Sequence, residues 1–152
     1  MNKTDDRQFR RKTALIPDYS SHLRLLVHNT TGTGTDDLPS HKPELILSIR
    51  GMTTHYHFDK KLTIMLGRID ASNLNNDDVD VDLTPYSAYE RGVSRLHMLM
   101  QLFPGNRIEV MDMGSSNGTH LSGKPLIPLK FYLLHDYDYL VLGRLPVQVH
   151  FQ

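Results

Sequence analysis

Three segments of the sequence combine residue types that enzymes and metal sites use. The first, residues 114–118 (Gly-Ser-Ser-Asn-Gly), matches the G-x-S-x-G pattern of a nucleophilic serine on a turn between a strand and a helix. The segment that follows contains Gly123, Pro125 and Pro128, which disfavour that helix. The pattern therefore does not predict a hydrolase, and we expect no catalytic residue in this chain.

The second segment resembles the start of a calcium-binding loop, because Asp78, Asp80 and Asp82 alternate along it. Such a loop needs glycine at its sixth position and a glutamate at its twelfth, where this sequence has Leu83 and Tyr89. The aspartates alternate with apolar residues instead. This alternation indicates the charged outer face of a β-strand.

The third segment contains His55 and His57, which share one face of an expected strand. Two histidines without a third ligand at a matching spacing do not predict a metal site. The chain also contains no cysteine, which excludes disulfides, thiolate ligands and a cysteine nucleophile. We therefore expect neither a metal nor a cofactor.

Composition places the chain among ordinary globular proteins. It has 152 residues, of which 39% are apolar, and this suits one domain with a real core. Lysine plus arginine and aspartate plus glutamate number 17 each, which argues against attachment to nucleic acid or membrane by bulk positive charge. No signal peptide or membrane-spanning run is visible, so we expect a cytoplasmic protein.

The first 43 residues differ from the rest. They begin with charged residues, continue through a short apolar patch at Leu23–Val27 and end in a stretch rich in Thr, Gly, Asp and Pro. Such a stretch buries too little surface to offset the entropy lost on ordering. We interpret residues 1–43 as a largely flexible N-terminal extension and residues 44–152 as the folded domain.

Residues 44–152 read as short strands separated by turn signals. The candidate strands are five to eight residues long, are rich in β-branched and aromatic residues, and lack a long helical period. They are ELILSIR, THYHFD, KLTIMLGR, VDVDL, HMLMQLF, RIEVMDM, DYLVLG and PVQVHF. This pattern predicts an all-β sandwich whose functional residues lie on loops.

Four loop motifs occur in a characteristic order along this domain. They are Gly67-Arg68, then Ser94-Arg95-Leu96-His97, then residues 114–119 (GSSNGT), then Ser122-Gly123. The domain thereby resembles the forkhead-associated (FHA) domain, whose pattern is GR, SxxH, a D-x-G-S-x-N-G-T turn and an NG-type turn. The stretch VDLTPYSAYERGVSRLH is similar to bacterial members. The resemblance covers about residues 44–152, and Ser122 departs from it where the last motif often has Asn.

The resemblance implies a sandwich of about eleven strands in two sheets that binds phosphothreonine peptides and performs no catalysis. Residue by residue, it assigns the main phosphate contacts to Arg68 and Ser94 and a further contact to Arg95. It assigns the contact to the peptide backbone to Asn117, and Ser116 occupies a position of the family that is often Thr or Ser. It assigns structural support of the binding loops to Gly67, His97, Gly118 and Thr119. We expect Gly67 and Gly118 to adopt backbone angles that other residues resist and to let the ligand approach closely.

The chemistry of these residues suits a phosphate. Phosphothreonine carries about −1.5 to −2 charge and three acceptor oxygens. A guanidinium supplies a fixed fork of N–H donors and a hydroxyl supplies an adjustable donor, so Arg68 and Ser94 match such a group. A local site of this kind is compatible with zero net charge. The expected function is recruitment of partners phosphorylated by a Ser/Thr kinase in signalling.

Two further hypotheses concern partners. Thr33 is followed three residues later by Asp36, and FHA domains commonly read the residue at this distance from the phosphothreonine, so the phosphorylated N-terminal segment is itself a candidate ligand. Tethering would give it an effective concentration on the order of mM. The alternative function is a phosphate-independent interaction module, to which the loop residues Tyr86 and Tyr89 would contribute.

Overall fold

A computed structural model describes residues 42–58, 61–72 and 77–152. These residues form eleven β-strands and two single-turn 3-10 helices, η1 (Thr84–Tyr86) and η2 (Pro104–Asn106). The strands in chain order are β1 (Glu44–Ile49), β2 (Met52–His57), β3 (Thr63–Gly67), β4 (Val81–Asp82), β5 (Leu96–Phe103), β6 (Arg107–Asp112), β7 (Thr119–Leu121), β8 (Lys124–Pro125), β9 (Phe131–Leu133), β10 (Tyr139–Leu142) and β11 (Leu145–Phe151).

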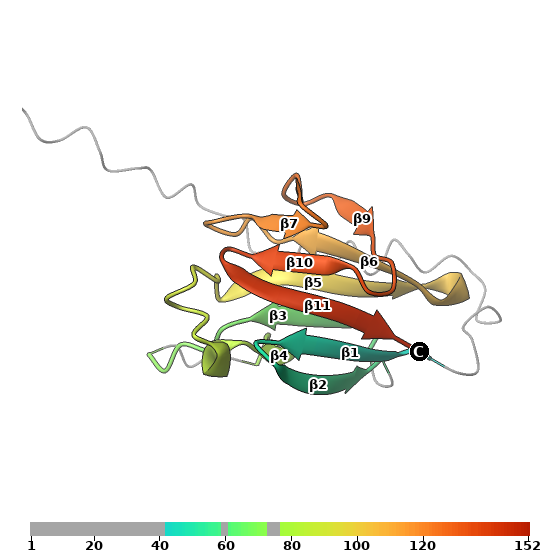
Figure 1. The fold of residues 1–152 in the computed structure, drawn as a ribbon, viewed down its shortest axis with the longest axis horizontal. Helices are drawn as coiled ribbons and strands as arrows, with labels where there is room; N and C mark the ends of the chain where they lie inside the picture. Colours follow the sequence, from blue (N-terminus) through green and yellow to red (C-terminus); the bar gives the residue numbers. More distant parts are fainter. Residues whose placement is uncertain (1–41, 59–60, 73–76) are drawn as a thin grey trace, which may run out of the picture. The chain divides into compact units, whose positions relative to one another are not determined.

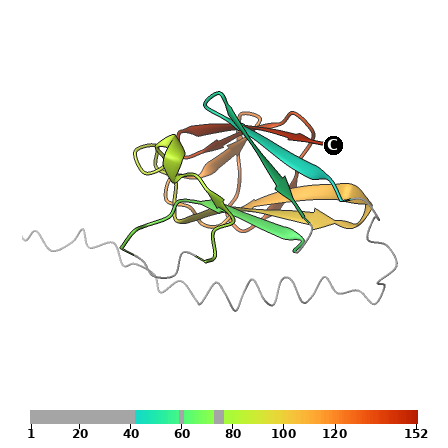
Figure 2. The same cartoon turned by 90° about the horizontal axis from the view of Figure 1, so that it is seen from below.

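The strands form two sheets that pack face to face, as Figures 1 and 2 show. One sheet has six strands in the order β2-β1-β11-β10-β7-β8, and the other has five in the order β4-β3-β5-β6-β9. Nearly all neighbouring strands are antiparallel, and the pair β3 and β4 is parallel. The predicted all-β sandwich of about eleven strands in two sheets is confirmed.

Side-chain alternation explains why these segments form strands. In β1, Leu45, Leu47 and Ile49 are fully buried while the residues between them are partly exposed. The strands β10 and β11 repeat this pattern with buried leucines and valines. Successive side chains of a strand point to opposite faces, so each strand contributes one apolar row to the space between the sheets.

The segment Thr119–Leu133 contains three strands that the sequence did not predict. β7, β8 and β9 are only two or three residues long, too short for an alternating pattern to emerge. Between β8 and β9, Leu126 is buried whereas Ile127 and Leu129 are exposed, so apolar residues there mark no regular buried row. The predicted turn at Ser122-Gly123 joins β7 to β8, and both of its residues have positive φ angles.

Asp80 and Asp82 are partly exposed and alternate with the fully buried Val81 and Leu83, as predicted, but the strand is shorter than expected. β4 itself contains only Val81 and Asp82. The carboxylates of Asp80 and Asp82 both accept hydrogen bonds from backbone amides. Asp80 accepts from the amide of Met65 at 2.8 Å and is also paired with Lys61. Asp82 accepts from the amide of Thr84 at 2.9 Å, because the chain turns directly after β4 and leaves amides without strand partners.

The N-terminal extension predicted for residues 1–43 lies almost entirely outside the described residues, and so do Thr33 and Asp36. The domain boundary before Glu44 and the proposed role of Thr33 therefore stay predictions. In the described ranges, no helix has the length and apolar character that crossing a bilayer requires.

Gly67 ends β3 where the pairing with β5 shifts its register. A Cβ atom at this position would lie 1.8 Å from the carbonyl oxygen of Arg95. The expectation of a special backbone angle is wrong for Gly67, whose φ is not positive, whereas Gly118 has φ +75°. Glycine is required at position 67 because the backbone just before β5 approaches the end of β3 too closely for any side chain.

We predict that Gly67→Ala lowers the free energy of unfolding by about 3 kcal/mol, because the added methyl group collides with backbone rather than with a flexible side chain. Urea denaturation measures this loss. Gly123→Ala is the matched control, since its Cβ meets open space and its cost is backbone strain of about 1 kcal/mol. Equal losses in the two variants would contradict the steric explanation.

Candidate functional site

The loops that carry the predicted site residues gather at one end of the sandwich, on the left in Figure 1. They are the loop after β3, the long loop between β4 and β5, the loop between β6 and β7, and the tight turn between β10 and β11. Arg68 directly follows β3, Ser94 and Arg95 directly precede β5, and Ser116 and Asn117 lie between β6 and β7. The structure therefore brings residues from three separate segments to the same end.

The loop between β4 and β5 is anchored by buried side chains. Tyr86, Ala88 and Val93 all belong to the hydrophobic core between the sheets. The expectation that Tyr86 offers an exposed surface is wrong, because its side chain is buried. Tyr89 is 71% exposed, as that expectation requires. A loop held at three points by the core keeps the residues before β5 in place.

The side chain of Arg68 is held on three sides. Its Nε donates a hydrogen bond to the carbonyl oxygen of Val93 at 3.0 Å. Its Cζ lies 5.0 Å from the ring centroid of Tyr89, a cation–π distance. Its Nη1 lies 3.8 Å from Oδ2 of Asp70. These contacts orient the guanidinium before any ligand arrives, and the side chain of Arg68 is still 19% exposed.

Ser94 connects two of the loops. Its hydroxyl oxygen accepts a hydrogen bond from the backbone amide of Ser116 at 3.0 Å. This bond uses a lone pair of the oxygen and leaves the hydroxyl proton available for an acceptor. The side chain of Ser116 is exposed, as is that of Arg95. Ser94 thus presents a donor whose position is fixed by the loop after β6.

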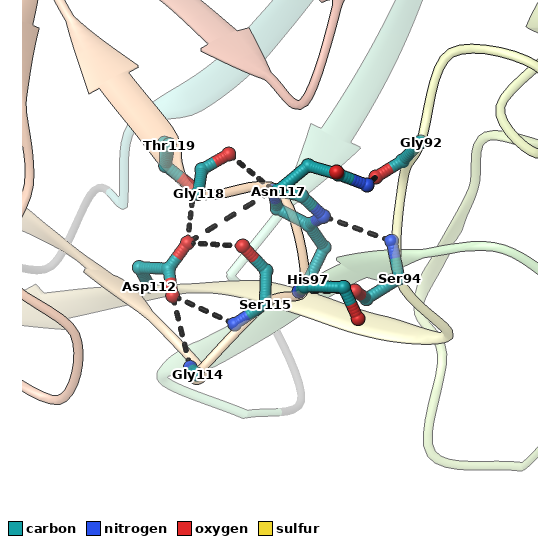
Figure 3. A network of polar contacts seen from close by, with 10 residues as sticks. Gly92, Ser94, His97, Asp112, Gly114, Ser115, Asn117, Gly118 and Thr119 are labelled. Carbon is teal, nitrogen blue, oxygen red and sulfur yellow. Dashed lines mark hydrogen bonds and ion pairs between the residues drawn. The ribbon is translucent and has the colours of Figure 1, made fainter. Parts of the chain in front are cut away.

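His97 is fully buried, and Figure 3 shows its ring among the residues of these loops. Its Nδ1 accepts a hydrogen bond from the backbone amide of Ser94 at 2.9 Å. Nε2 therefore carries the proton and donates to the carbonyl oxygen of Gly118 at 3.2 Å. Burial lowers the pKa of His97, although Asp112 and the Gly118 carbonyl act in the opposite direction. The neutral ring links the segment before β5 to the segment before β7.

Asp112 organises the turn that follows β6. It is fully buried, and its carboxylate accepts hydrogen bonds from the amides of Gly114 and Ser115, from the Ser115 hydroxyl and from the Thr119 hydroxyl, at 2.6 to 2.9 Å. Burial alone raises the pKa of Asp112, but the hydrogen bonds from Thr119 and Ser115 outweigh it, and the pKa lies below its usual value. The ionised carboxylate therefore fixes both ends of the turn (Figure 3).

Asn117 holds the loop on the opposite side. One N–H of its side-chain amide donates to the carbonyl oxygen of Gly92 at 2.9 Å. The side-chain carbonyl oxygen of Asn117 is an acceptor at the exposed surface. Gly92 has φ +74°, and a Cβ atom there would lie 2.5 Å from the Asn117 amide nitrogen. The asparagine and the glycine therefore fit only as a pair.

Two arginines support the outer side of the loop between β4 and β5. Arg50, in the turn between β1 and β2, donates to the hydroxyl of Ser87 at 3.2 Å. Arg144, in the turn between β10 and β11, donates from Nη2 to the carbonyl oxygen of Glu90 and from its backbone amide to that of Arg91. The β1–β2 and β10–β11 turns of the six-stranded sheet thus brace the loop that carries Ser94.

Sequence reasoning did not single out Asp112, Gly92 or the two bracing arginines. It also did not predict that Tyr89 contacts Arg68. Asp112 stands at the first position of the D-x-G-S-x-N-G-T pattern, so its place in that motif was the available signal. The others depend on contacts between distant segments. No local pattern in the sequence marks them.

The residues of the alternative sites are used otherwise. β7 follows Ser116 where a nucleophile turn would need a helix. His55 and His57 lie 2.7 and 3.7 Å from a carboxylate oxygen of Glu44 on the neighbouring strand. Within residues 42–58, 61–72 and 77–152, no cluster of three or more His, Asp or Glu side chains has the arrangement of a metal site.

Comparison with known families identifies the arrangement. The sequence profile of the FHA domain matches residues 64–143, which is more than half of the chain. The chain belongs to the FHA family. The matched range extends from β3 to the turn after β10, and it contains the loops that carry Arg68, Ser94, Arg95, Ser116 and Asn117.

Solved FHA domains share the fold. The FHA domain of an Arabidopsis thaliana hypothetical protein is 27% identical, with a TM-score of 0.54 over 72% of this chain and 86% of that chain. The FHA domain of the CT664 protein from Chlamydia trachomatis is 20% identical, with a TM-score of 0.54 over 72% and 97%. The MEK1 FHA domain, in complex with a phosphothreonine peptide of HOP1, is 23% identical, with a TM-score of 0.52 over 70% and 94%. No curated protein matches the chain.

We predict that the FHA domain loses stability in acid partly through Asp112. Its folded-state pKa is below the unfolded value of about 3.9, so its stabilising contribution is complete above that pH and is lost as the pH falls through the folded-state pKa. Asp112→Asn should be less stable at neutral pH and should show a shallower decline in unfolding free energy below about pH 4. Urea denaturation across this range measures both effects.

The matched control for this prediction is Asp78→Asn, which removes an exposed carboxylate. The control should keep the wild-type decline. A decline of wild-type steepness in Asp112→Asn would show that another group carries the acid sensitivity.

Proposed function

We propose that this FHA domain binds phosphothreonine peptides through Arg68, Ser94 and Asn117, and thereby recruits partners phosphorylated by a Ser/Thr kinase. The observation that carries the proposal is the convergence of a preoriented guanidinium and a hydroxyl donor at the end of the sandwich. A phosphate dianion needs several donors that are fixed before it arrives, because ordering them on binding would cost affinity.

Arg68 supplies the charge. Its hydrogen bond to the Val93 carbonyl uses Nε and leaves its terminal amino groups to face the ligand. Ser94 supplies the second donor, because its oxygen already accepts the Ser116 amide and its proton is free to donate. Arg95 and Ser116 are exposed beside them and complete the proposed phosphate site. Gly67, His97, Gly118 and Thr119 keep these loops in register.

Asn117 is the proposed contact to the peptide backbone. One N–H of its amide donates to the Gly92 carbonyl, which leaves its second N–H to donate to a peptide carbonyl and its own carbonyl oxygen to accept a peptide N–H. The proposed function requires no catalytic residue and no cofactor. Binding by MEK1 of a phosphothreonine peptide is the precedent within the fold.

We predict that Arg68→Ala weakens phosphothreonine-peptide binding by about 10- to 150-fold, because hydrogen bonds to charged groups contribute about 1.5–3 kcal/mol. The assay titrates an oriented phosphothreonine library, with phosphoserine and unphosphorylated pools alongside, by fluorescence anisotropy. Arg107→Ala is the matched control, because it removes an exposed arginine at the start of β6, outside the site loops.

Phosphate-dependent binding that survives Arg68→Ala combined with Ser94→Ala would refute the proposal. Equal binding of phosphorylated and unphosphorylated pools would support the phosphate-independent alternative, in which exposed Tyr89 is the aromatic contact. Absence of binding in every pool, both for the whole chain and after removal of residues 1–43, would refute the phosphopeptide function.

A further inference from the structure

A carboxylate lies inside the proposed phosphate site. Oδ2 of Asp70 is 3.8 Å from Nη1 of Arg68, the guanidinium that would receive the phosphate. Asp70 is held there by a local turn, in which its Oδ1 accepts the amide of Ser72 at 3.0 Å and the Ser72 hydroxyl at 2.6 Å. One oxygen of the carboxylate is thus fixed by Ser72 while the other faces Arg68.

Asp70 is ionised in this setting. The hydrogen bonds from Ser72 lower its pKa most, and the charges of Arg68 and Arg95 lower it further. Because electrostatic interaction is mutual, the same carboxylate reduces the positive potential that both arginines offer to a ligand. The site therefore combines two guanidinium groups with one opposing charge, although its proposed ligand is a dianion.

We propose that Asp70 determines specificity: it disfavours phosphothreonine peptides with acidic neighbours and favours those with a lysine or arginine beside the phosphothreonine. This inference rests on the proposed phosphopeptide function. A phosphate on Arg68 comes to lie close to the Asp70 carboxylate, and the two like charges repel. A cationic side chain of the peptide placed between or beside them offsets that repulsion.

Repulsion of this kind is a common means of discrimination. Specificity is a difference between affinities, and an opposing charge can reject one class of ligand more effectively than extra contacts attract another. Val93 and Tyr89 also contact the guanidinium of Arg68 and orient it. Orientation of Arg68 therefore does not depend on this carboxylate alone.

The test compares the wild-type chain with Asp70→Asn, which keeps the size of the side chain and the acceptor oxygen that Ser72 uses, and removes the charge. Both proteins are titrated with phosphothreonine peptides that carry Lys, Ala or Glu at each of the two positions on either side of the phosphothreonine. We expect wild type to prefer Lys over Glu at one of these positions by about three- to tenfold, and more strongly at low salt. Asp70→Asn should lose this preference and bind the Glu peptide more tightly.

Glu109→Gln is the matched control, because it removes the same charge from β6 next to Arg107, outside the site loops, and should keep the wild-type preference. An unchanged preference in Asp70→Asn overturns the inference. Uniformly weaker binding by Asp70→Asn also overturns it and assigns Asp70 to holding Arg68 instead. In both cases wild type still binds phosphopeptides, so the proposed function stands; if wild type binds none of them, the proposed function and this inference fail together.

Discussion

The geometry of the site depends on one buried, neutral imidazole. His97 lies on the first part of β5 and connects the amide of Ser94 to the carbonyl of Gly118, two groups that no strand ladder satisfies. A buried polar group without a partner is costly, so the ring and the two loop segments order one another. Protonation would turn the accepting nitrogen into a donor directed at the Ser94 amide, and burial disfavours that state by lowering the pKa of His97.

Asp112 and two glycines extend this constraint to the turn between β10 and β11. The Asp112 carboxylate accepts hydrogen bonds from both ends of the turn after β6. The carbonyl oxygen of Gly118 also accepts a hydrogen bond from the amide of Gly143, in the turn between β10 and β11. Gly92 and Gly143 allow their backbones to approach neighbours that any side chain would displace. The exposed donors thus rest on loops that buried hydrogen bonds tie together, and these loops hold the guanidinium of Arg68 in place.

The sequence was sufficient for the parts of the fold that local pattern determines. Alternation identified strands such as β1 and β11, and the order of the GR, SxxH and GSSNGT motifs identified the family. Short strands such as β8 were not predicted, because two residues are too few to show an alternating pattern. Tyr86 was predicted to be available to a partner but is buried, because the burial of a loop side chain depends on the whole core. The contacts of Arg144 with Glu90 and of Arg68 with Val93 join segments far apart in sequence, so only the three-dimensional arrangement reveals them.

The central claim is that the preoriented Arg68 and Ser94 form one phosphate site at the end of the sandwich. The most direct test is a ¹H–¹⁵N NMR titration of the whole chain with N-acetyl phosphothreonine amide, which follows the backbone amides and the Arg68 Nε–H. The account predicts that the largest changes fall on Arg68, Ser94 and the residues from Ser116 to Gly118. Changes concentrated on the edge strands β2 or β9, with Arg68 and Ser94 unaffected, would contradict it.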